Sequence, residues 1–188
     1  MEHKESLESF FWGMLGEALK ERSVETAPET EHYLVQMLTA YASQPVDETP
    51  LALKMLAARE AAPPERRKHL REVGDTSLFV SGFWSDSFAR RAVDVDYYIG
   101  MGGIAYGQLA RTGDGWMRDP NGSVYQELAE RFARFVGVLE VLSRCLMPAA
   151  TPQDIVKLYD RFKTTGSRWA ASRLAALGVV LPAGGRPQ

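Results

Sequence analysis

Apolar residues recur at three- and four-residue steps along almost the whole chain, and this period constrains the fold more than any other feature of the sequence. In the first segment the repeat runs through Leu7, Phe10, Phe11, Met14, Leu15, Ala18 and Leu19. The longest periodic segment extends from Ser123 to about Leu146. Such spacing places the apolar side chains on one side of an α-helix. With no pair of segments that indicates a β-hairpin, the sequence predicts an all-α protein.

Prolines mark where several of these helices begin. Pro28, Pro50, the Pro63–Pro64 pair and Pro152 each precede or open a periodic segment, and proline is favoured in the first turn of a helix. We therefore expect a single-domain helical bundle of about seven or eight helices over residues 1–180. The central pair of helices is expected at 65–84 and 94–111, and residues 181–188 are expected to form a flexible C-terminal tail.

The composition is that of a globular protein in a reducing compartment. Of the 188 residues, 45% are hydrophobic and 24% are charged, which suits one substantial core. The lone cysteine, Cys145, excludes an intrachain disulfide framework and fits the cytoplasm. No apolar run approaches the roughly 18 residues that a membrane span needs. We expect a soluble cytoplasmic protein that has no membrane partner.

The charge is distributed unevenly along the chain. Residues 1–130 hold 13 Lys and Arg against 21 Asp and Glu, whereas residues 131–188 hold 9 against 3. A basic C-terminal part suits an anionic partner. The simpler interpretation is that basic helices pack beside acidic ones and neutralise them.

One set of carboxylates and histidines has the spacing of a transition-metal site. Glu29 and His32 form a Glu-x-x-His pair, and Glu65, His69 and Glu72 share one face of another helix. Imidazole and carboxylate together suit iron, manganese or zinc, so two such helices face to face would resemble the site of a di-iron bundle. However, those bundles repeat Glu-x-x-His in two helices, and only one copy occurs here. The competing interpretation is exposed acids in first helical turns, where the helix dipole favours them.

A second group of polar residues lies in the two helices expected at the centre of the fold. Its members are Asp75, Ser77, Ser81, Asp94, Asp96, Tyr97, Tyr98 and Tyr106. Buried tyrosine hydroxyls need partners, and the Asp and Ser of the preceding helix can supply them. Alternatively, these groups line a ligand pocket between the two helices.

Three glycines of the second central helix share one face with Asp96. They are Gly100, Gly103 and Gly107. Because a glycine costs about 1 kcal/mol relative to alanine inside a helix, this stripe predicts that something approaches closely. Another helix backbone is the simpler occupant, and a flat ligand is the alternative.

The two helices expected at 151–163 and 167–177 are joined by a short turn, as in a helix-turn-helix. Phosphate contacts would come from Lys157, Arg161, Lys163, Arg168 and Arg173. Any pair of short helices resembles this motif, however, and an overall pI near 6.0 gives nucleic-acid binding no support.

The leading interpretation of function is non-catalytic: an interaction or regulatory domain that binds a protein partner or self-associates. Trp12, which falls off the apolar stripe of the first helix, and the charge asymmetry motivate it. Nucleophilic catalysis has little support, since Cys145 lies among apolar neighbours and is expected to be a buried, inert thiol. A metal-dependent helical-bundle oxidoreductase and a DNA-binding regulator stay open as alternatives.

Overall fold

The computed structural model of the chain describes residues 2–43, 47, 49–83, 95–111, 119–146, 152–165, 171, 174, 179 and 180. This part contains eight helices and no strand, which confirms the predicted all-α bundle. The helices are α1 (Glu2–Glu21), α2 (Pro28–Ser43), α3 (Leu51–Glu60), α4 (Pro63–Phe83), α6 (Val95–Arg111), α7 (Gly122–Glu130), α8 (Phe132–Leu146) and α9 (Pro152–Thr165). None of the described helices is both long and apolar enough to cross a membrane.

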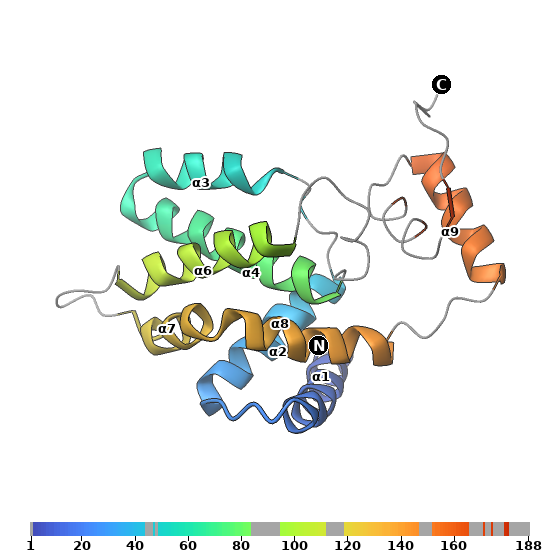
Figure 1. Cartoon of the computed structure of the whole chain (residues 1–188), viewed down its shortest axis with the longest axis horizontal. Coiled ribbons are helices and arrows are strands. Elements are labelled where there is room, and N and C mark those ends of the chain that lie inside the picture. The colour runs from blue at the N-terminus through green and yellow to red at the C-terminus, as the bar shows by residue number, and fades with distance from the viewer. Residues whose placement is uncertain are drawn as a thin grey trace.

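The helices are arranged in successive layers (Figure 1). Helix α3 covers one side of α4, which packs along its length against α6. Helices α7 and α8 form the next layer, with α7 against α6 and α8 against α4. On the far side of that layer lie α1 and α2. The predicted central pair, α4 and α6, has the most extensive contact between described helices, so this prediction is confirmed.

Proline begins the helices where the sequence predicted it. Pro28, Pro63 and Pro152 are the first residues of α2, α4 and α9, and Pro50 directly precedes α3. The fixed φ angle of proline suits this position, and its missing N–H group has no partner to lose there. The predicted helix start at Asp94, most of the predicted helix 167–177 and the predicted tail 181–188 lie outside the described residues.

Glycines let the central helices approach one another at three points. A Cβ atom placed on Gly74 of α4 would lie 2.6 Å from the Tyr106 ring, and one on Gly82 would lie 2.3 Å from Cβ of Leu139. Gly102 of α6 is equally crowded, at 2.3 Å from the Phe132 ring. Only residues without a side chain fit these positions, so they fix how closely α4, α6 and α8 pack.

The predicted long segment 123–146 is two helices, because the chain leaves helical geometry at Arg131 (φ −117°, ψ 21°). The two halves face different partners. Helix α7 packs mainly against α6, whereas α8 packs against α4 and α1. A single straight helix presents one apolar stripe. Because of the break, the apolar residues of α7 pack against α6 while those of α8 pack against α4 and α1.

Candidate functional site

The most polar part of the described core is a carboxylate that binds two tyrosines. Oδ1 of Asp75, in the middle of α4, accepts hydrogen bonds from the Tyr33 hydroxyl of α2 at 2.5 Å and from the Tyr106 hydroxyl of α6 at 2.7 Å. The Asp75 side chain is only 18% exposed, and its Oδ2 lies 3.9 Å from Nε of Arg71. Asp75 therefore joins three helices: its own α4, α2 and α6.

Aromatic packing holds the two tyrosines in place. The Tyr33 and Tyr125 rings meet edge to face at a centroid distance of 5.7 Å, and Tyr106 stacks on Tyr125 at 5.9 Å. Gly74 makes room for the Tyr106 ring, since any larger residue there would overlap it. The glycine beside Asp75 in the sequence is thus what allows Tyr106 to reach the carboxylate.

The electrostatics of this cluster favour a stable hydrogen-bonded arrangement. Burial raises the pKa of Asp75, while the hydrogen bonds from Tyr33 and Tyr106 and the Arg71 charge act in the opposite direction. Burial, followed by the Asp75 charge, raises the pKa of Tyr33 and Tyr106 well above the ordinary value. The two hydroxyls consequently remain protonated and act as donors over the physiological pH range.

The two tyrosine hydroxyls occupy the atom of Asp75 that would otherwise act as a base. Neither of the two surface depressions described below is lined by Asp75 or by its tyrosines. A general base must reach the proton that it removes, whereas Oδ1 is occupied by two hydroxyls. The arrangement is suited to fixing the relative positions of α2, α4 and α6.

The other residues of the predicted pocket do not join this cluster. Ser77 is fully buried, and its hydroxyl has no hydrogen-bond partner among the described residues. The Ser81 hydroxyl donates to the Ser77 carbonyl of its own helix at 2.7 Å. Asp96 is exposed, as is Tyr97, which meets Tyr98 edge to face. Asp94 lies outside the described residues. Among the described residues of this predicted group, one predicted hydrogen bond is present: the Tyr106 hydroxyl donates to Asp75.

The residues of the predicted metal set are not gathered into one site. They are Glu29 and His32 on α2 and Glu65, His69 and Glu72 on α4. The His32 ring stacks on Trp12 at a centroid distance of 6.0 Å, and its Nε2 lies 2.8 Å from the amide nitrogen of Gln36. Nδ1 of His69 lies 3.7 Å from Glu72. Within the described part of the chain, no group of three or more His, Cys, Asp or Glu is placed to hold a metal ion.

Three further sequence predictions concern the helix-turn-helix, Cys145 and Trp12. Helix α9 matches the first helix of the predicted helix-turn-helix, but most of the second lies outside the described residues. Cys145 is exposed, so the prediction of a buried thiol was wrong. The buried side of α8 runs through Leu139 and Leu142, and Cys145 falls off that side. Trp12 is 38% exposed and has His32 as a neighbour in its own chain.

Sequence reasoning missed Glu127, which accepts hydrogen bonds at the N-terminal end of α2. Its carboxylate accepts hydrogen bonds from the hydroxyls of Thr26 at 2.8 Å and Thr30 at 2.7 Å, and from the backbone N–H of Ala27 at 3.3 Å. Nη1 of Arg131 donates to the same carboxylate at 2.7 Å. A negative charge stabilises the N-terminal end of a helix, but no local pattern links residues about 100 positions apart.

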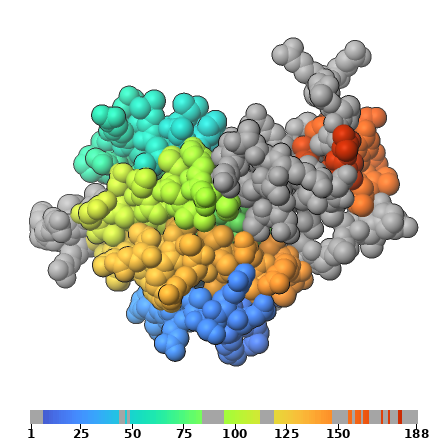
Figure 2. Space-filling view, viewed as in Figure 1, coloured from blue at the N-terminus to red at the C-terminus, as the bar shows by residue number. Residues whose placement is uncertain are grey.

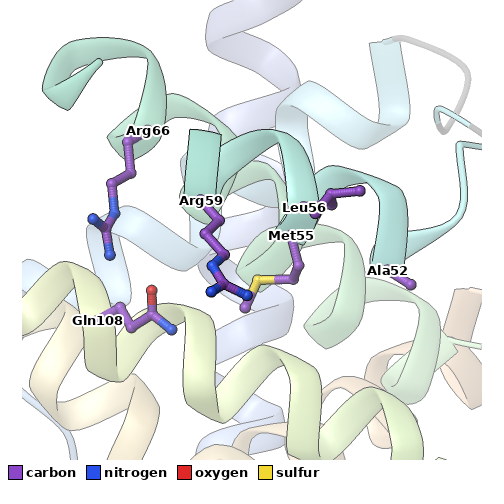
Figure 3. Close-up of a pocket in the computed structure, with 6 residues that line it drawn as sticks. All are labelled: Ala52, Met55, Leu56, Arg59, Arg66 and Gln108. Carbon is purple, nitrogen blue, oxygen red and sulfur yellow. The ribbon is translucent and has the colours of Figure 1, made fainter. Parts of the chain in front are cut away.

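Two of the depressions on the described surface lie between helices. The larger, of about 460 Å³, lies between α3, α4 and α6 (Figure 3). Its lining consists of Ala52, Met55, Leu56 and Arg59 from α3, Arg66 from α4 and Gln108 from α6. The smaller, of about 240 Å³, lies between α1 and α8, with Cys145 among its lining residues.

Comparison with known proteins identifies no relative. No protein-family model matches the chain, and neither a curated protein nor a solved structure is significantly similar to it.

Proposed function

We propose that this protein is a helical interaction module that self-associates by pairing the outer face of α6 with the same face of a second copy. One observation carries the proposal: the α6 stripe, which we define as Asp96, Gly100, Gly103, Ile104, Gly107 and Arg111, is symmetric in charge and size about the middle of the helix. Figure 2 shows α6 (yellow-green) at the surface of the molecule.

The α6 stripe is exposed where the fold leaves it uncovered. Ile104 is 53% exposed, and Tyr97, which follows Asp96 in the first turn of the helix, is 39% exposed. A Cβ atom on Gly100 would meet nothing within 4 Å, and Gly103 and Gly107 make only ordinary contact with Ala129 of α7. The sequence analysis predicted that another helix packs closely against this stripe. Within the described part of the chain this prediction is wrong for Gly100. No neighbour within the described chain requires a glycine at position 100, whereas a second helix backbone that approached closely would require one.

An antiparallel pair of α6 helices matches every member of the stripe with a complementary one. Gly103 and Ile104 lie at the middle, and Gly100 and Gly107 lie equally far to either side. Asp96 in the first turn would meet Arg111 in the last turn of the other copy. Both side chains are exposed and have no ion-pair partner among the described residues. A two-fold axis requires such self-complementarity, because every contact between two residues occurs twice, once in each direction across the axis.

Sedimentation equilibrium of charge-swapped variants tests the proposal. Asp96→Lys would place two lysines against the two Arg111 side chains, so we expect the dimer to weaken by roughly tenfold, since two contacts change sign. Asp96→Lys combined with Arg111→Glu should restore association, because both ion pairs re-form with reversed polarity. Failure of the double variant to recover would exclude this pairing, and a monomer at all concentrations would overturn the proposal altogether.

A second variant tests the apolar centre of the stripe. Ile104→Glu introduces two charges at the two-fold axis and should abolish the dimer, because like charges would face each other. Val156→Glu on α9 is the matched control, since Val156 is 59% exposed and not in the stripe. Val156→Glu should leave association unchanged, and association that survives Ile104→Glu would place the interface elsewhere. The expected cytoplasmic location stays part of this proposal, supported by the single cysteine, and cell fractionation tests it.

A further inference from the structure

The larger depression is bounded on one side by exposed apolar side chains of α3. Leu56 is 49% exposed, and Met55 and Ala52 continue the same wall. Apolar side chains grouped in a concave surface are typical of ligand sites rather than of plain solvated surface. The volume, about 460 Å³, lies in the range of roughly 300–1,000 Å³ that ligand pockets occupy.

Two arginines from different helices enter this depression. Arg59 extends from α3 beside Met55, and Arg66 extends from α4 toward Gln108 of α6 (Figure 3). Neither has an ion-pair partner among the described residues, although Glu60 and Glu65 are adjacent to them in the sequence. Elsewhere in the described structure arginines do pair with carboxylates, as Arg22 does with Glu140 at 3.0 Å.

We infer that the depression between α3, α4 and α6 binds an organic anion that carries a carboxylate or phosphate group on an apolar chain. The guanidinium groups of Arg59 and Arg66 hold the anionic group, because arginine is suited to paired hydrogen bonds with carboxylate and phosphate oxygens. Met55 and Leu56 pack against the chain. Two positive charges in one depression repel each other, and a bound anion relieves that repulsion.

This inference goes beyond the proposed pairing of α6, because the lining residues are not members of the α6 stripe. Gln108 is the residue of α6 in the depression, and it lies outside the stripe. Ligand binding should therefore persist in the monomeric Ile104→Glu variant. That variant separates failure of the binding site from failure of self-association.

Calorimetric titration with small probes tests the inference. Octanoate and octyl phosphate contain both halves of the expected ligand, acetate contains only the charge, and octanol contains only the chain. We expect at least one of the two complete probes to bind more tightly than acetate and octanol, and the tighter of the two identifies the anionic group. No binding by either complete probe, or equal affinity for octanol, would overturn the inference.

Variants of the lining residues localise the site. Arg59→Gln and Arg66→Gln should each weaken binding by roughly tenfold or more, because each removes charged hydrogen bonds. Leu56→Ser should weaken binding of octanoate without changing that of acetate. Arg134→Gln on α8 is the control, since Arg134 is an exposed arginine outside the depression. If the arginine variants bind as well as the control, the depression is not the binding site.

Discussion

Two glycines of α6, separated by one residue, should respond in opposite ways to an added methyl group. In Gly102→Ala the new Cβ would lie 2.3 Å from Cζ of Phe132 and 2.8 Å from Cβ of Ser77. The Phe132 ring is only 3% exposed, so it has little room to withdraw. Overpacking a core in this way costs about 1–3 kcal/mol. In Gly100→Ala the same atom would meet nothing within 4 Å.

The helix propensity of alanine decides the sign at Gly100. Alanine in place of glycine inside a helix stabilises by about 1 kcal/mol, and no steric term opposes it there. At Gly102 the same gain offsets only part of the overpacking, and the crowding comes from two directions, which places the steric cost at the upper end. We expect Gly102→Ala to lower the free energy of unfolding by about 1–2 kcal/mol. The two variants should thus differ by about 2–3 kcal/mol.

Urea unfolding followed by circular dichroism measures this difference. Midpoints are compared at one protein concentration, low enough for the monomer to predominate, and with equal slopes for all variants. If Gly102→Ala proves as stable as Gly100→Ala, the close contact between α6 and Phe132 is incorrect. The proposed pairing adds a second readout, because a methyl group on Gly100 would separate the two α6 helices. Gly100→Ala should weaken association while it stabilises the monomer.

Two further predictions concern polar contacts between helices. Tyr106→Phe removes one of the two donors to the mostly buried Asp75, so the free energy of unfolding measured in urea should fall by about 1–2 kcal/mol; an unchanged value would contradict the hydrogen bond. Burial raises the pKa of Glu127, but hydrogen bonds from Thr30, Thr26 and the Ala27 N–H and the Arg131 charge together hold it below its ordinary value. The stability that Glu127 contributes should therefore be present above its unfolded-state pKa of about 4.3 and be lost as the pH falls through the lower folded-state pKa. The destabilisation caused by Glu127→Gln should accordingly shrink in acid, and a deficit that grows in acid would contradict this assignment.

The helix boundaries could be predicted because their signals are local. The helix starts at Pro28, Pro63 and Pro152 follow from the geometry of proline and its preceding residue, independently of the tertiary contacts of each helix. The break at Arg131 was missed because the apolar repeat continues through it without a proline or glycine. Only the change of partner, from α6 to α4 and α1, distinguishes the two halves.

The contacts of α6 were harder to predict because the helix is apolar on most of its surface. The sequence contains two stripes, one through Gly100, Gly103 and Gly107 and another through Gly102, Ala105, Tyr106 and Leu109. The second is the buried one. Its large aromatic and aliphatic members were the signal that could have identified it, since a core needs volume as well as small residues.

The polar core was partly predictable for the same reason. Tyr106 and Asp75 lie in neighbouring helices of the chain, and a buried hydroxyl on one needs a partner on the other. Tyr33 and Glu127 were missed because their partners are distant in sequence. Periodicity identifies which side of a helix is buried, but it carries no information about which other helix covers that side.

The cap on α2 also determines when the first helices can be completed during synthesis. Glu127 follows Thr30 by 97 residues, and Arg22, directly after α1, donates hydrogen bonds to the carbonyl of Gly137 and the carboxylate of Glu140. A ribosome releases the N-terminus first, so α1 and α2 emerge with Leu15 and Leu34 uncovered. Their partners α7 and α8 follow only after more than half of the chain has been made, whereas Asp75 of α4, the partner of Tyr33, is made earlier. The sides of α1 and α2 that α7 and α8 cover therefore wait longer for burial than the side of α2 that meets α4, and they are the surface that a chaperone would protect during synthesis.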